Sequence, residues 1–207
     1  MNQRVGNVLL ASSLLVGACG DAAPTPELTI AQSEHLLTQQ ENELRDFWRT
    51  QGVGIEATKL ALVSDTQTAS CEVPVNGVNE KKEVLGSSPA AMRYCESSDE
   101  ITVGKGAIRF ITQLTRESGV PTANALAIIA AHETGHAVQK RLYTTVGLTT
   151  EVELQADCLA GKSLAATNSS ALVSVRALFS ALGPDFGHGT VNQRVASFHK
   201  GATTGKC

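Results

Sequence analysis

Residues 125–143 read ALAIIAAHETGHAVQKRLY, and this stretch decides the fold of the 207-residue chain. Leu126, Ile129, Ala130 and Val138 recur at the spacing of one helical face. The stretch is also too long to be a single strand. We therefore expect a central helix over 125–143, onto which the rest of the domain packs.

The helix carries the motif His132-Glu133-Thr134-Gly135-His136. Residues four apart lie one above the other on a helix, so both imidazoles can bind one zinc ion. Glu133 is turned by about 100° from His132, which places its carboxylate beside the ion, where a general base is needed. The alternative is a polar patch on an amphipathic helix, but that would bring three ionisable groups into an apolar helix without partners.

A third metal ligand is expected from the segment Glu153-Leu154-Gln155-Ala156-Asp157, 17 residues after His136. This separation lets the chain turn and return antiparallel past the metal. Glu153 is the expected ligand, and Asp157, one turn later, can accept the outer N–H of a ligating histidine and fix its tautomer. Glu151 is a rival ligand, but it lies about 200° from Glu153 around the helix.

The remaining chain predicts an α+β domain that is mainly α-helical and spans residues 33–207. A polar, glycine-containing region around 75–88 separates two strand-like pieces. We expect a small sheet from these pieces and a set of amphipathic helices around the central one. The expected strands are 58–63 and 100–103, and the other expected helices are 33–51, 107–117, 150–166, 169–182 and 191–200.

Three motifs together give a specific resemblance to a known family. They are HETGHAVQ at 132–139, ELQADCLAG at 153–161, and HGT at 188–190 followed by Gln193-Arg194 and Phe198. Over roughly residues 40–201 the chain resembles the bacterial neutral zinc metallopeptidase family. The resemblance implies a zincin-like domain of the gluzincin type, with an HExxH active-site helix. It also implies one Zn²⁺ per chain held by His132, His136 and Glu153, with Glu133 catalytic.

The expected reaction is peptide hydrolysis by an activated water molecule. Zinc lowers the pKa of a water to about 7 and polarises the scissile carbonyl, while Glu133 takes the water proton and passes it to the leaving nitrogen. His188, flanked by two glycines that allow an unusual backbone, is the candidate that stabilises the oxyanion. The other candidates for the oxyanion role are Tyr94, Tyr143 and Arg194. For Arg194 a structural role is the alternative, as the partner of Asp185 or Asp157 in an ion pair.

The first 18 residues are typical of a signal peptide, because Arg4 precedes an apolar stretch far shorter than the roughly 20 residues that span a bilayer. The sequence Leu15-Val16-Gly17-Ala18-Cys19 resembles the lipobox of bacterial lipoproteins and predicts cleavage before Cys19 and lipidation of its thiol. An ordinary secretory signal is the alternative. Residues 19–32 are then the lipidated cysteine and a flexible tether. By resemblance to sorted bacterial lipoproteins, Gly20 in place of aspartate after Cys19 implies the outer membrane, facing the periplasm.

The other four cysteines predict disulfides, because an even number in an exported protein favours pairing. Of the three connectivities we prefer Cys71–Cys95, which closes a local loop, and Cys158–Cys207, which ties down the C-terminus. A cysteine zinc site is disfavoured because no Cys-x-x-Cys spacing is present. The net charge of −3 and the absence of a basic block exclude nucleic acid as a leading partner.

These patterns predict a zinc-dependent endopeptidase of the bacterial cell envelope, with a peptide or protein substrate and a lipid anchor in the membrane. A different class remains open, a lipid-anchored zinc-containing binding or assembly protein without turnover. A zinc hydrolase that does not act on peptides is a third possibility. Structural zinc sites close all four positions with cysteine or histidine, so three ligands beside a base favour the enzyme.

Overall fold

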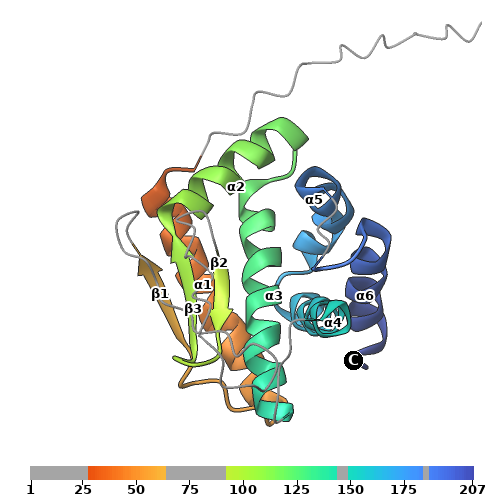
Figure 1. Ribbon diagram of the computed structural model, residues 1–207. Coiled ribbons are helices and arrows are strands. Elements are labelled where there is room, and N and C mark those ends of the chain that lie inside the picture. The colour runs from red at the N-terminus through yellow and green to blue at the C-terminus, as the bar shows by residue number, and fades with distance from the viewer. Residues whose placement is uncertain (1–27, 64–91, 144–148, 184–186) are drawn as a thin grey trace, which may run out of the picture.

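The computed structural model describes residues 28–63, 92–143, 149–183 and 187–207. These form an α+β fold that is mainly helical and includes a three-stranded sheet, as the sequence predicts (Figure 1). In chain order the elements are α1 (Ile30–Thr50), β1 (Lys59–Val63), β2 (Met92–Cys95), β3 (Glu100–Gly104), α2 (Lys105–Ser118), α3 (Thr122–Leu142), α4 (Thr150–Thr167), the 3₁₀ helix η1 (Ser169–Ser174), α5 (Val175–Leu182) and α6 (Val191–Thr204).

Helix α3 runs through the middle of the domain (Figure 1). The sheet and α1 lie on one side of α3, and α4, α5 and α6 lie on the other. Most side chains from Ala125 to Gln139 are buried. A helix that is apolar on all sides is buried on all sides, so the run ALAIIAA before the motif accounts for this central position.

The sheet has the strand order β1-β3-β2. β1 pairs with β3 in parallel and β2 pairs with β3 antiparallel, so Tyr94 lies opposite Ile101. On β3, Ile101 and Val103 are buried in the main core. Among the described residues β2 pairs with β3 alone, so the other edge of β2 is left to face α3.

Helix α1 begins earlier than expected because its N-terminus is capped. Thr29 and Gln32 form a capping box, and the helix starts at Ile30, inside the segment predicted as tether. Leu37, Leu44 and Trp48 recur at helical spacing along one face of α1, and all three are buried. The core face of this helix therefore follows from its periodicity, whereas its first turn depends on the cap.

The helix expected over 169–182 is divided into η1 and α5. Asn168, just before η1, has φ −150° and ψ 69°, and its side chain accepts a hydrogen bond from the Ser170 hydroxyl at 2.7 Å. Serine and asparagine side chains compete with helical hydrogen bonds in this way. The regular helix begins only at Val175.

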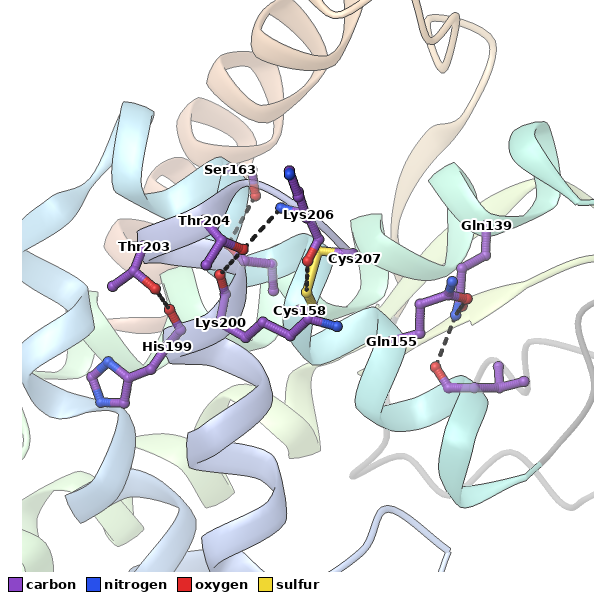
Figure 2. Close-up of a disulfide and its surroundings, with 12 residues drawn as sticks. Gln139, Gln155, Cys158, Ser163, His199, Lys200, Thr203, Thr204, Lys206 and Cys207 are labelled. Atoms are coloured by element: carbon purple, nitrogen blue, oxygen red, sulfur yellow. Dashed lines mark hydrogen bonds between the residues drawn. A yellow bond between two sulfur atoms is a disulfide. The ribbon is translucent and has the colours of Figure 1, made fainter.

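Helices α4 and α6 are in close contact and are covalently joined. A Cβ atom at Gly161 would lie 2.0 Å from the carbonyl oxygen of Phe198, so only glycine allows this approach. The predicted disulfide between Cys158 on α4 and Cys207 after α6 is present (Figure 2). It keeps α6, which contributes to the site below, against α4.

Several predictions concern residues outside the described part of the chain. These are the signal peptide at 1–18, the lipidation site at Cys19, most of the tether and the Cys71 half of the Cys71–Cys95 pair. Within the described ranges, no helix combines the length and apolarity needed to cross a membrane.

Candidate metal centre

Helix α3 presents two imidazoles from adjacent turns. The Nε2 atoms of His132 and His136 are 3.2 Å apart, and the rings are nearly perpendicular, with centroids 4.8 Å apart. Both side chains are largely buried. The motif therefore places two metal-binding nitrogens at one point beside α3, as its spacing predicts.

Helix α4 brings Glu153 to these nitrogens. Glu153 Oε2 lies 3.1 Å from His132 Nε2 and 3.3 Å from His136 Nε2. The approach depends on Gly135, because a Cβ there would lie 2.7 Å from the carbonyl oxygen of Ala156 on α4. The rival ligand Glu151 is exposed to solvent.

The three atoms have the spacing of ligands around one ion. Donors bound at about 2.0–2.2 Å to a tetrahedral ion are roughly 3.3–3.6 Å from one another. The separations of 3.1–3.3 Å among His132, His136 and Glu153 are close to that range. Glu153 Oε2 is also buried without a hydrogen bond. A cation would compensate this carboxylate oxygen, so the cluster could hold a metal ion.

Asp157 contacts the Nδ1 side of the His132 ring, and Arg194 in turn holds the Asp157 carboxylate. His132 Nδ1 is 2.8 Å from Asp157 Oδ1, and Arg194 on α6 donates two hydrogen bonds of 2.9 Å to the Asp157 carboxylate. The Arg194 guanidinium also lies 3.9 Å from the centroid of the Phe179 ring. Arg194 is thus paired with Asp157, the second of the two structural partners that the sequence suggested.

The carboxylates attract positive charge to the cluster. Burial lowers the pKa of His132, but the charge and hydrogen bond of Asp157, with smaller effects from Glu153 and Glu133, raise it to about 10. Burial raises the pKa of Glu153, but His132 and His136 bring it well below its usual range. In the metal-free protein, a proton on His132 partly balances these carboxylates.

Gln139 supports the second imidazole, and the sequence analysis assigned it no role. His136 Nδ1 is 2.8 Å from Gln139 Oε1. The Gln139 amide nitrogen donates to Val152 O at 2.8 Å and to Gln155 Oε1 at 2.9 Å, which links α3 to α4 (Figure 2). Its position three residues after His136, on the same helix face, was the only sequence signal for this contact.

The carboxylate of Glu133 is held by the edge of the sheet. Glu133 Oε2 accepts a hydrogen bond of 2.6 Å from the backbone N–H of Tyr94 on β2. The Tyr94 hydroxyl donates to Asp99 Oδ1 at 2.8 Å, and the Tyr143 hydroxyl accepts from Gln155 at 3.0 Å. The hydroxyls of Tyr94 and Tyr143 were both candidates to stabilise the oxyanion, and each has a different hydrogen-bond partner in the structure.

His188 lies at the cluster, on the turn before α6. Its Nε2 atom is 3.3 Å from Glu153 Oε2. Ligand atoms of His132, Glu153 and His188 all lie within 4.8 Å of one another. Gly189 has φ +92°, a conformation that favours glycine, as the sequence suggested for this turn.

A cavity of about 320 Å³ opens beside His132 and Glu133. Its walls come mainly from α2, α3 and α5, with smaller parts from β2, α6 and the turn before α6, and are mainly apolar. Two of the apolar side chains, Phe110 and Leu182, are exposed, which is unusual for residues of this size next to a polar site. The apolar residues that line it are Met92, Ala107, Phe110, Ile111, Ile128, Ile129, Phe179 and Leu182.

Glu41 on α1 is a buried acid behind the motif, and no sequence pattern predicted it. Its Oε2 accepts a hydrogen bond of 3.0 Å from the Thr134 hydroxyl, and Arg45 lies 3.6 Å from its other oxygen. Burial raises the pKa of Glu41 to about 7. The contact joins α1 to the middle residue of the HETGH motif.

Comparisons with models of protein families, with curated proteins and with solved structures gave no match. The interpretation of the site therefore depends on its own residues and geometry.

Proposed function

We propose that the protein is a zinc-dependent endopeptidase with a zincin-like domain, in which α3 is the active-site helix. His132, His136 and Glu153 bind one zinc ion per chain. The observation that carries the proposal is the convergence of the His132 and His136 Nε2 atoms on the buried Glu153 Oε2. The carboxylate of Glu133, the residue after His132 on α3, lies beside them. Two imidazoles and one carboxylate are a ligand set of catalytic zinc sites.

A bound zinc ion supplies a Lewis acid for the scissile carbonyl and for the attacking water. Glu133 accepts the proton of that water and donates it to the leaving nitrogen. The Tyr94 N–H at 2.6 Å orients the Glu133 carboxylate for this transfer. His188, which also lines the cavity, donates a hydrogen bond to the oxyanion.

The cavity favours a peptide with a large apolar side chain next to the scissile bond. Its volume of about 320 Å³ and its apolar walls suit leucine, isoleucine or phenylalanine. His132 and Glu133 form one wall, so a side chain in the cavity places its backbone beside the catalytic groups. The substrate class is therefore a peptide or protein segment.

The N-terminal motifs and the family resemblance also support a proposal about the family and the cellular location of the protein. We place the enzyme in the bacterial neutral zinc metallopeptidase family, as a lipoprotein anchored through Cys19 in the outer membrane and facing the periplasm.

Cys19→Ala tests the lipid anchor, and this substitution should release the protein from membranes into the soluble fraction. Unchanged membrane retention would rule out this anchor.

One observation favours the second candidate, a lipid-anchored zinc-containing binding or assembly protein without turnover. His188 Nε2 is as close to Glu153 Oε2 as His136 Nε2 is, at 3.3 Å. A zinc site closed permanently by four side chains is typical of a structural role.

Metal content and cleavage of a peptide library test the proposal. Purified wild-type protein and Glu151→Ala should contain one zinc per chain, whereas Glu153→Ala should lose most of it. Glu151 is the matched control because it is an exposed glutamate on the same helix. Wild type should cleave library peptides, and a chelator should stop the cleavage. A zinc content near zero contradicts the proposal, and zinc without cleavage favours the binding protein.

A further inference from the structure

We propose that His188 is a fourth protein ligand of the metal in the substrate-free protein, and that it is the exchangeable one. This inference rests on the proposed metal site, and it changes the coordination of that site from three protein ligands to four. His132, His136 and Glu153 remain the fixed ligands.

The first argument is the position of the imidazole nitrogen. His188 Nε2 is 3.3 Å from Glu153 Oε2, the same separation as that between His136 Nε2 and Glu153 Oε2. The ring centroids of His188 and His132 are 5.7 Å apart. Glu153 Oε2 thus has the Nε2 atoms of three histidines at 3.1–3.3 Å, and the ligand atoms of His132, Glu153 and His188 lie within 4.8 Å of one another.

The second argument is that the turn carrying His188 is attached to the helix that carries Glu153. The Thr150 hydroxyl, on the first turn of α4, donates to the carbonyl oxygen of Gly187 at 3.3 Å. On the other side of His188, Gly189 lies against Thr150 and Leu154, so a Cβ there would be 3.1 Å from the Thr150 methyl. Thr190 then caps α6. Contacts on both sides therefore hold His188 beside Glu153.

The third argument separates His188 from the other ligands. The side chains of His132, His136 and Glu153 are 5%, 13% and 9% exposed and lie on α3 and α4, whereas that of His188 is 37% exposed and lies on a turn. A side chain on an exposed turn can leave the metal without disturbing a helix. His188 is thus the ligand that a substrate can displace.

With zinc bound, four protein ligands would fill the positions of a tetrahedral site and leave none for water. The substrate-free protein would then be in a resting state, and hydrolysis would require His188 to move aside. His188 lines the cavity from its position beside Glu153, so its imidazole, once released, would remain near the substrate and could donate a hydrogen bond to the oxyanion. This order of events reconciles the metal-binding position of His188 with its proposed role in catalysis.

X-ray absorption spectroscopy of the zinc-loaded full chain tests the inference without measuring activity, because it counts the imidazoles bound to the metal. We expect three imidazoles in wild type and two in His188→Ala, which should still contain zinc. His199→Ala is the matched control, since it removes an exposed histidine of α6 and should leave the count at three. In cobalt-substituted protein, azide should bind His188→Ala at least tenfold more tightly than wild type, because a position is open.

Two imidazoles in wild-type protein would overturn the inference, and the same count of two in His188→Ala would leave the proposed three-ligand site intact. This wild-type count is decisive even if His188→Ala fails to fold. A count of three in His188→Ala, or equal azide affinity in the two proteins, would also overturn it. If wild type binds no zinc at all, the proposed function and this inference both fail.

Discussion

Glu153 Oε2 is buried among imidazole nitrogens, and burial of a carboxylate costs free energy that a cation can recover. In the metal-free protein a proton on His132 serves this purpose in part, since the pKa of His132 is raised to about 10. The same carboxylates that raise this pKa, chiefly that of Asp157, would also stabilise a metal ion. Protons and metal therefore compete for His132.

This competition gives a pH-dependent prediction. With the pKa of His132 raised to about 10, the imidazole is positively charged in the metal-free protein at neutral pH. An imidazole that binds zinc must be neutral, so zinc binding should release about one proton. Zinc affinity should consequently rise about tenfold per pH unit between pH 6 and 8. Isothermal titration calorimetry in buffers of different ionisation enthalpy measures the proton release. Binding without proton release would show that His132 is already neutral in the metal-free protein, which would contradict this prediction.

The close positions of the candidate site residues were predictable where one helix sets their spacing. His132, Glu133 and His136 follow from a single motif, and Glu153 with Asp157 follows from a second helix of the right separation. Other contacts between elements were not predicted, because a single sequence does not state which surfaces meet. The Tyr94 N–H on Glu133 and the Glu41 carboxylate beneath Thr134 are contacts of this kind.

At the scale of elements, the site depends on how closely α4 approaches α3. Gly135 makes this approach possible, because its missing side chain leaves room for the α4 backbone at Ala156. The glycine lies between Glu133 and His136 in the motif. The turn of α3 that holds the proposed catalytic and metal-binding side chains is therefore also the turn that α4 contacts. The α4 contact in turn places Glu153 and Asp157.

Gly135→Ala should therefore destabilise the protein and weaken the metal site. Glycine to alanine inside a helix normally stabilises by about 1 kcal/mol. Here the new Cβ meets the Ala156 carbonyl, and overpacking of this kind costs about 1–3 kcal/mol. Chemical denaturation should show the loss, and competition with a chromophoric chelator should show at least tenfold weaker zinc binding. A more stable Gly135→Ala protein would contradict the close approach.

Most elements were predictable from periodicity, and the differences have local causes. The helices around the apolar stripes of α1, α2, α3, α4 and α6 are present, with ends shifted by caps such as the Thr29 capping box. The strand β2 and the order β1-β3-β2 were not predicted, because pairing between strands distant in sequence depends on packing. The η1 break follows from the side chain of Asn168, which periodicity does not detect.

At the scale of the whole molecule, the C-terminal disulfide stabilises the fold and also holds α6, which contributes a residue to the candidate site. Cys158 and Cys207 are 49 residues apart, and α6 between them carries Arg194, which supports Asp157. A chain-entropy estimate for a loop of this length gives about 4 kcal/mol. Cys207→Ser should lower the free energy of unfolding by about 2–4 kcal/mol in urea titrations. A change below 0.5 kcal/mol would show that the disulfide does not stabilise the domain.

The cavity makes a prediction about substrate choice. Phe110→Ala removes a half-exposed aromatic ring from the cavity wall and should lower kcat/KM about tenfold for peptides with leucine or phenylalanine next to the scissile bond. Peptides with alanine at that position should be affected much less. Val173→Ala is the control, since Val173 is 84% exposed and does not line the cavity. Equal losses for both peptide classes would exclude the cavity as a specificity pocket.

The central claim is that Glu133 is the base of a metal-dependent peptidase, and Glu133→Gln tests it most directly. Glutamine keeps the size of the side chain and an oxygen that accepts the Tyr94 N–H, but it cannot take the proton of water. The measurement is kcat/KM on a library-selected peptide for wild type and Glu133→Gln, each at one zinc per chain. The account predicts a loss on the order of a hundredfold or more with zinc content and unfolding midpoint unchanged. Equal kcat/KM for the two proteins would contradict it.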